Sequence, residues 1–296
     1  MRTGTLQVCG GTLETAWWGP GPTEALTLVL LHEGLGSVAL WRDVPARLAA
    51  ATGCCVFAYS RFGYGNSDTT PLPRPMTYLH DEALVVLPEV LRAAGIERTV
   101  LVGHSDGGSI AAIYAGSLSL SLSSWPGSSV PPMAAPAEIG GPDEPGHGDC
   151  RHRAIHLIGL VTIAAHFIVE ELNIVSIRQI KTEYETGPLR QRLTRYHRDV
   201  DAAFRGWNDA WLDPHFQKFD ITAFLPNIQV PILALQGADD PYGTDVQLRV
   251  MEANVHASIT TQLIDGAKHS PHLEATDKTL VTIASFIAAL PRGAST

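Results

Sequence analysis

The chain has 296 residues, of which 45% are hydrophobic and 17% are charged, and its formal net charge is −9. This composition is too apolar for a disordered chain, and no apolar run approaches the length of a membrane-spanning helix. The negative charge, with no local cluster of Lys or Arg, argues against nucleic acid, whose phosphates require a basic surface. We therefore expect one α/β domain with a small appended subdomain and neither a nucleic-acid nor a membrane partner.

The N-terminus and the cysteines indicate a compartment. Residues 1–5 lack the apolar stretch of a signal peptide. The four cysteines are scattered, and Cys54 and Cys55 fall in an apolar, strand-like run where reduced thiols are the expected state. These features predict a cytoplasmic protein.

Apolar runs of strand length recur along the chain. Residues 5–18 alternate loosely around Gly10 and Gly11, which predicts a hairpin of two strands. Six later runs are continuous enough for strands that are buried on both faces. These runs are residues 26–31, 54–59, 99–102, 157–163, 231–235 and 259–264. Because helical patterns separate most of them, we expect a mostly parallel sheet of about eight strands with helices on both faces.

Two of the helical patterns have clear boundaries. Residues 81–94 carry leucines at helical spacing and stop at Gly95, and Pro88 is expected to kink this helix. Residues 277–290 form the last helix, with Thr276 as a candidate N-cap.

Two segments interrupt the alternation of strands and helices. Residues 117–150 are rich in Ser, Pro and Gly, which predicts a long surface insertion. Residues 166–228 have a helical pattern that places Phe204, Trp207 and Trp211 on one face. We expect this segment to form a helical cap over a core made of residues 1–165 and 229–296.

The sequence around Ser105 is that of a nucleophile elbow. A β-rich run reaches a G-x-S-x-G pattern at residues 103–107 and passes directly into a segment compatible with a helix. Gly103 and Gly107 lack Cβ atoms, which allows the strand and the helix to pack closely around a strained serine. This pattern predicts a nucleophilic serine only if a base and an acid accompany it.

Candidates for both partners follow later strands. A serine nucleophile needs a base to take its proton and a carboxylate to orient that base. His269 comes after the run at 259–264, and Asp239 and Asp240 come after the run at 231–235. The order Ser, acid, His is the one expected for this elbow. We take His269 as the base, while the pattern alone leaves two candidates for the acid.

With these motifs the chain resembles the α/β-hydrolase superfamily. The resemblance implies that the acid is Asp240, the third residue after a glycine, and we expect the side chain of Asp239 to cap the turn. Residues 32–37 are similar to the superfamily's His-Gly-x-x-x-Ser turn, which implies an oxyanion hole made of the backbone N–H groups of Gly34 and Asp106. Glu33 occupies a position that is usually glycine, so its carboxylate either joins a hydrogen-bond network or faces the cleft.

The Ser-Asp-Gly-Gly sequence at the elbow is similar to that of valacyclovirase-like hydrolases of amino-acid esters. In that subgroup the acidic residue after the nucleophile recognises the α-amino group of the substrate, which implies the same role for Asp106. We favour a structural role instead, in which the side chain bonds to the neighbouring backbone.

A cap that packs over the sheet leaves a cleft above the nucleophile. We expect Glu33, Leu35, Trp207 and Trp211 to bind substrate there, and His166 to be a structural histidine. No cofactor is expected, because the sequence contains no dinucleotide fingerprint.

A group of possible zinc ligands occurs near the middle of the chain. His147, Cys150, His152 and His156 have suitable side chains, but the first lies in the insertion and the last begins a strand. We therefore expect no metal site.

These observations predict a serine hydrolase that cleaves a small-molecule carboxylic ester, lactone or thioester and is a monomer or homodimer. Three alternatives share the fold. One is hydrolysis of a carbon–carbon bond, as in ring-cleavage hydrolases. The second is peracid formation, as in cofactor-free haloperoxidases, and the third is a slow-turnover receptor for a small molecule. The complete set of Ser, His and Asp favours an enzyme.

Overall fold

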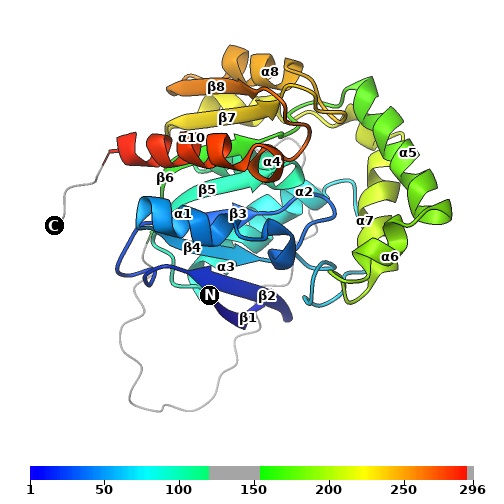
Figure 1. Ribbon diagram of the computed structural model, residues 1–296, viewed down its shortest axis with the longest axis horizontal. Helices are drawn as coiled ribbons and strands as arrows, with labels where there is room; N and C mark the ends of the chain where they lie inside the picture. Colours follow the sequence, from blue (N-terminus) through cyan, green and yellow to red (C-terminus); the bar gives the residue numbers. More distant parts are fainter. Residues whose placement is uncertain (120–153, 292–296) are drawn as a thin grey trace.

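A single sheet of eight strands runs through the computed structural model, which describes residues 1–119 and 154–291. The strand order is β1-β2-β4-β3-β5-β6-β7-β8 (Figure 1). The strands are β1 (Arg2–Val8), β2 (Gly11–Trp18), β3 (Thr27–Leu31), β4 (Cys55–Tyr59), β5 (Arg98–His104), β6 (His156–Ile163), β7 (Ile232–Gly237) and β8 (Ile259–Ile264). β1 pairs with β2 and β2 pairs with β4 in antiparallel fashion. The other six strands, β3 to β8, are parallel to one another. The predicted hairpin and the mostly parallel sheet are confirmed.

Helices cover both faces of the sheet (Figure 1). α1 (Val44–Thr52) and α10 (Thr276–Ala289) lie side by side against one face of the sheet. Their side chains form a hydrophobic core with Leu28 and Leu30 of β3. α3 (Leu87–Ala93), α4 (Asp106–Ser117) and α8 (Val246–Asn254) contribute to the core on the other face. Each face therefore has its own hydrophobic core, as a doubly covered sheet requires.

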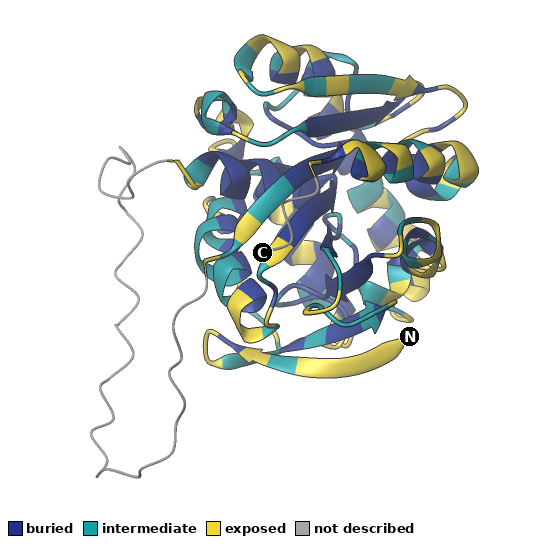
Figure 2. Ribbon diagram, turned by 90° about the vertical axis from the view of Figure 1, so that its left-hand side faces the viewer, coloured by how far each residue is buried: buried dark blue, intermediate teal, exposed yellow. Residues whose placement is uncertain are grey.

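Burial differs between the centre and the edges of the sheet. Every residue of β3, β4 and β7 is buried, which explains why these strands read as continuous apolar runs. β1 is mostly exposed, and Figure 2 shows it as a yellow ribbon at the edge of the molecule.

The helix expected at residues 81–94 begins earlier and has three parts. α2 (Tyr78–Asp81) leads into η2 (Glu82–Val86), a π-helical turn, and α3 follows. In a regular α-helix Pro88 would lack an N–H to donate, and its ring would clash with the carbonyl four residues earlier. The wider π turn accommodates the proline at the start of α3. The helix ends before Gly95, which has a φ of 66°.

The expected N-cap of the last helix was wrong. Thr276 is the first residue of α10, and the capping position belongs to Ala275. The short helix α9 (Pro271–Glu274) leads directly into α10, and the Thr279 hydroxyl donates to the carbonyl of Pro271 at 2.9 Å. An N-cap residue has a non-helical backbone, whereas Thr276 is already part of the helix that follows α9 almost directly. Its hydroxyl therefore does not cap α10.

The segment after β6 is helical and lies to one side of the sheet (Figure 1). It contains α5 (Glu171–Thr186), α6 (Leu189–Leu193), α7 (Val200–Leu212), η4 (Phe216–Lys218) and η5 (Thr222–Asn227). We refer to α5, α6 and α7 as the lateral helices. Most of the insertion expected at 117–150 lies outside the described residues, as do three of the possible zinc ligands, His147, Cys150 and His152, whereas His156 is the first residue of β6. Within the described ranges, none of the helices combines the length and hydropathy that a bilayer crossing requires.

Candidate active site

Ser105 lies on a tight turn between β5 and α4. Its backbone has φ 53° and ψ −119°, a region that costs a non-glycine residue about 1–3 kcal/mol. The flanking glycines make this turn possible. A Cβ on Gly103 would lie 2.2 Å from the carbonyl oxygen of Gly107, and a Cβ on Gly107 would lie 2.0 Å from that of Leu31. The strand, the turn and the helix can therefore approach only where both side chains are absent.

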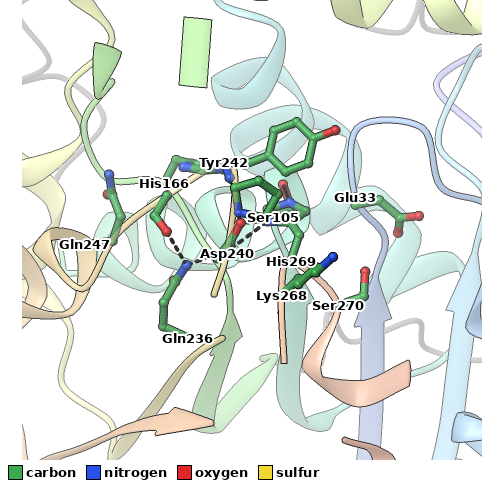
Figure 3. A network of polar contacts seen from close by, with 12 residues as sticks. Glu33, Ser105, His166, Gln236, Asp240, Tyr242, Gln247, Lys268, His269 and Ser270 are labelled. Atoms are coloured by element: carbon green, nitrogen blue, oxygen red, sulfur yellow. Dashed lines mark hydrogen bonds and ion pairs between the residues drawn. The ribbon is translucent and has the colours of Figure 1, made fainter. Parts of the chain in front are cut away.

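Ser105, His269 and Asp240 form a continuous hydrogen-bonded series (Figure 3). His269 Nε2 lies 3.0 Å from Ser105 Oγ. His269 Nδ1 lies 2.8 Å and 3.0 Å from the two carboxylate oxygens of Asp240. A carboxylate only accepts, so Nδ1 of His269 carries the proton and Nε2 is left to accept the hydroxyl proton of Ser105. Such an arrangement can convert the hydroxyl into a nucleophile.

Asp240 lies on the loop after β7 and His269 on the loop after β8, and these two loops are in close contact. A Cβ on Gly237 would lie 1.8 Å from the carbonyl oxygen of Lys268. The N–H of Asp239 donates to the carbonyl of Ala267 at 3.0 Å. Asp240 is consequently buried and directed at His269, while the side chain of Asp239 is exposed and makes no hydrogen bond to a described residue. The turn is closed by the backbone of Asp239 and not by its carboxylate.

The Asp240 carboxylate is held in its ionised form. Burial acts to raise its pKa, but the hydrogen bond and charge of His269 and the N–H of Tyr242 outweigh burial and lower it. Tyr242 N–H donates to Oδ1 at 2.8 Å, and the Gln236 amide donates to Oδ2 at 2.6 Å. A carboxylate held by these donors can orient an imidazole and stabilise its positive charge.

The backbone amides expected to form an oxyanion hole belong to Gly34 and Asp106. Asp106 is the first residue of α4, where N–H groups have no intrahelical partner. Neither amide donates a hydrogen bond to another described residue. At Gly34 a Cβ would lie 2.1 Å from Trp207 Nε1, so the glycine allows α7 to approach this turn.

The two roles considered for Glu33 were a place in a hydrogen-bond network and a place at the cleft, and the residue has both. Its backbone carbonyl accepts from Arg61 Nη2 at 2.9 Å and from His32 Nδ1 at 2.7 Å. Its carboxylate lies 3.4 Å from His104 Nδ1, borders the pocket and is 27% exposed. Burial acts to raise the pKa of Glu33, but the hydrogen bond and charge of His104 outweigh it and lower the pKa well below its usual range. Figure 3 shows this carboxylate directed away from Ser105.

Asp106 has a fully buried side chain that does not border the pocket. Its carboxylate accepts from the Tyr78 hydroxyl at 2.8 Å and from Trp211 Nε1 at 3.3 Å. Arg61 Nη2 lies 3.6 Å away and is equally buried. The favoured structural role therefore holds with different partners, because the carboxylate contacts side chains from α2, α7 and the loop after β4 and not the neighbouring backbone.

A small pocket of about 100 Å³ opens beside Ser105 and His269. All four residues predicted to bind substrate line this pocket, namely Glu33, Leu35, Trp207 and Trp211. Four further residues line it, namely His166, Asn173, Ile177 and Tyr242. Sequence reasoning missed the last three of these. Tyr242 was detectable in principle, because it stands two residues after the candidate acid, whereas Asn173 and Ile177 carry no such signal.

His166 was expected to be structural, but it borders the pocket. It is 3% exposed, and its ring stacks along that of His269 with centroids 5.8 Å apart. Burial and then the charge of His269 lower the pKa of His166 to about 3. His104 and His272 are also buried, and the His104 ring lies between His272 and His269.

A second, larger hollow of about 800 Å³ lies far from these groups. It is lined by residues at the amino ends of the strands, among them Leu26, Cys54 and Arg98. None of Ser105, Asp240 and His269 borders it. The smaller pocket is therefore the candidate substrate site, because Ser105 and His269 line it.

Comparison with known proteins assigns the family. The model of the alpha/beta hydrolase family matches residues 28–281, so the chain belongs to this family and is a hydrolase. Solved structures share the fold at low sequence identity. A proline iminopeptidase from Mycobacterium smegmatis is 17% identical over 97% of this chain and 98% of its own, with a TM-score of 0.68.

Two other structures differ from it in the activity that they are named for. An esterase from a Rhodococcus species is 19% identical, with 98% of this chain and 99% of its own covered and a TM-score of 0.65. An enol-lactonase from Burkholderia xenovorans is 16% identical, with 96% and 100% covered and a TM-score of 0.66. A search of curated protein sequences found no match. The resemblance to the valacyclovirase-like subgroup stays a prediction.

Proposed function

We propose that this hydrolase cleaves a carboxylic ester, lactone or thioester of a small molecule, with Ser105 as nucleophile, His269 as base and Asp240 as the orienting acid. The observation that carries the proposal is the hydrogen-bonded series between them, with 3.0 Å from Ser105 Oγ to His269 and 2.8 Å from His269 to Asp240. The strained turn at Ser105 supports it further, because such a turn exposes Oγ at the end of the strand.

In the first half of the reaction, Ser105 Oγ attacks the substrate carbonyl carbon while His269 Nε2 takes the hydroxyl proton. Asp240 stabilises the resulting imidazolium through Nδ1–H. The negative charge that develops on the carbonyl oxygen receives hydrogen bonds from the N–H groups of Gly34 and Asp106. The intermediate then expels the alcohol or thiol, which takes the proton from His269, and an acyl-enzyme remains.

In the second half, water replaces the alcohol. His269 takes a proton from the water, whose oxygen attacks the acyl carbon, and the same two N–H groups stabilise the second intermediate. Collapse of this intermediate releases the carboxylic acid and returns the proton to Ser105. The lateral helices act as a cap over the reacting groups, and Glu33, Leu35, Trp207 and Trp211 surround the substrate.

The test is the hydrolysis of 4-nitrophenyl esters with acyl chains of two to six carbons, together with labelling by a fluorophosphonate. The Ser105→Ala variant should lose about 10⁶-fold in kcat, as in serine hydrolases whose nucleophile is removed, and should no longer be labelled. Circular dichroism should show that the variant is folded. A wild-type protein that neither hydrolyses these esters nor reacts at Ser105 would contradict the proposal.

The alternatives give different results in the same assays. A carbon–carbon hydrolase would cleave a vinylogous diketone faster than it cleaves any ester, which product analysis detects. A receptor would be labelled by the fluorophosphonate as an enzyme is, but it would turn over these esters only slowly.

A further inference from the structure

The ring of His166 has a fixed position beside the candidate base. The residue follows β6, and its main chain is held by Ser109, whose hydroxyl donates to the His166 carbonyl at 2.6 Å. The ring stacks along His269 and meets the Trp211 ring edge-on, with centroids 5.3 Å apart. Figure 3 shows His166 in the group around Ser105 and Asp240. A side chain held in this way can present one ring nitrogen to the pocket in a defined direction.

The side-chain amide of Asn173 has an orientation that its partners determine. Its Oδ1 accepts from the backbone N–H of Glu170 at 2.5 Å, and its Nδ2 donates to the carbonyl of Tyr242. Because a backbone N–H only donates and a carbonyl only accepts, the amide cannot be turned over. The second hydrogen on Nδ2 is then available to His166, whose Nδ1 lies 3.4 Å away.

This contact determines where the proton of His166 is. An amide NH₂ group only donates, so Nδ1 of His166 accepts, and the proton of the neutral ring lies on Nε2. The ring stays neutral because its pKa is lowered to about 3, chiefly by burial. Nε2 has no hydrogen-bond partner among the described residues. It is also not one of the fully buried polar atoms that lack a partner, so it is accessible from outside the ring's packing. Gly243 lies beside Cε1 and Nδ1 of the ring, and His166 borders the pocket, so we take Nε2–H as the donor that His166 offers there.

The surroundings make such a donor selective. Leu35, Ile177 and Trp211 present apolar surface to the same pocket, and the indole N–H of Trp211 is occupied by Asp106. A hydrogen-bond donor in an apolar pocket disfavours a ligand that leaves it unpaired. A substrate with an oxygen at this point gains the bond, whereas a hydrocarbon analogue of the same shape displaces solvent from the donor and replaces it with nothing.

We propose that His166 is a specificity residue whose Nε2–H binds a second oxygen of the substrate, an ether, hydroxyl or carbonyl oxygen close to the reacting ester. The preferred substrates are then esters with an oxygen in the acyl or alcohol chain, and not esters of plain hydrocarbon chains. This inference rests on the proposed function, because it concerns the substrate of the same site.

The experiment compares pairs of esters that differ by one atom. The acyl pair is 4-nitrophenyl methoxyacetate and 4-nitrophenyl butyrate, in which an ether oxygen replaces a CH₂ group. The alcohol pair is 2-methoxyethyl butyrate and butyl butyrate. For each pair the ratio of kcat/KM, oxygen analogue over hydrocarbon analogue, is divided by the ratio of the hydroxide-catalysed rates. Intrinsic reactivity is thereby removed.

The wild-type protein should prefer the oxygen analogue in at least one pair, and His166→Phe should reduce that ratio about tenfold, the loss expected for one buried hydrogen bond. The pair that responds identifies the side of the ester that carries the oxygen. His166→Gln should restore most of the ratio, since its amide nitrogen reaches the position of Nε2. Ile177→Leu, which reshapes the wall without touching a donor, should change both members of a pair alike.

Three results would overturn the inference. The first is a wild-type protein with no corrected preference in either pair, a measurement that does not depend on any variant. The second is an equal loss by His166→Phe on all four esters, which would make His166 structural. The third is no restoration in a folded His166→Gln. Ester hydrolysis with an unaltered ratio defeats this inference alone, whereas no hydrolysis of any ester by the wild-type protein defeats the proposed function as well.

Discussion

The reacting edge of the site and its pocket wall are built in different ways. Ser105, Asp240 and His269 each follow a strand of the parallel sheet, and their strands end at the same edge. Much of the wall comes from two of the lateral helices, α5 with Asn173 and Ile177 and α7 with Trp207 and Trp211. Trp207 packs against Gly34, and Trp211 bonds to Asp106.

This difference has a physical consequence. A side chain that follows a central strand is positioned largely by the backbone of the sheet, so we expect its replacement to affect catalysis more than the stability of the fold. A wall residue is positioned by buried polar contacts between distant segments, so its replacement alters stability and selectivity together. Substitutions at four residues, taken from the largest expected effect to the smallest, test this separation.

Asp240→Asn should lower kcat on 4-nitrophenyl esters by on the order of 10⁴-fold, because an amide nitrogen facing Nδ1 favours the wrong tautomer of His269. The free energy of unfolding should fall by about 1–3 kcal/mol, because the new NH₂ group must face either the Tyr242 N–H or the Gln236 amide, and urea denaturation measures this. The neighbouring Asp239→Asn is a matched control, since its side chain is exposed. It should leave kcat/KM within about twofold of wild type. Equal losses in the two variants would contradict the assignment of the acid.

Asp106→Asn should lower the free energy of unfolding by about 3–5 kcal/mol, because it leaves the buried Arg61 without this carboxylate. Urea denaturation tests this, with Glu89→Gln as a control. Glu89 pairs with Arg92 on the surface, where loss of an ion pair costs less than about 1 kcal/mol.

The same Asp106 variant also tests selectivity. The ratio of kcat/KM between an amino-acid ester and its des-amino analogue should not change, because the carboxylate does not border the pocket. A selective loss for the amino-acid ester would restore the recognition role that the elbow sequence suggests.

Gly34→Ala should reduce kcat/KM by about 10- to 100-fold, since the added methyl group requires 1–3 kcal/mol of adjustment at the Trp207 indole. Because the clash involves Nε1 of Trp207, the smaller ring of Trp207→Phe should recover activity in the double variant. A double-mutant cycle measures the coupling. Additive losses would show that the wall and the oxyanion turn do not depend on each other.

The smallest effect concerns pH. His166 has a folded pKa of about 3, so the unfolded chain binds more protons than the folded one below pH 6.5. Stability is therefore full above pH 6.5 and falls as the pH drops towards 3, by about 1 kcal/mol for this residue between pH 6.5 and 5.5. His166→Gln should flatten the pH dependence of the unfolding free energy by that amount. Buried His32 and His272, whose pKa values burial also lowers, keep the remaining slope.

Much of the reacting edge was predictable because its signals are local. The apolar runs, the glycines around Ser105 and the order of Ser105, Asp240 and His269 depend on neighbouring residues and on the rule that parallel strands end at one edge. The errors also arose locally. The sequence suggested Thr276 as a cap, but the preceding helix α9 left no room for one.

The lateral helices show where prediction stops. Their helical character and the aromatic face of α7 were expected, yet the partners of Asp106 lie on other segments, and Trp211 is 105 residues away. Nothing near Asp106 in the chain indicates that its carboxylate is already occupied by Tyr78 and Trp211.

The sequence by itself determined the doubly covered sheet, the elbow at Ser105 and the two loops that supply Asp240 and His269, because periodicity and turn chemistry act over a few residues. Only the tertiary structure decided what surrounds them: that Asp106 is buried in a polar network, that Glu33 borders the pocket while bonded to His104, and that the amide of Asn173 lies at Nδ1 of His166. These properties depend on burial and on hydrogen bonds between distant segments, which exist only once the chain is folded.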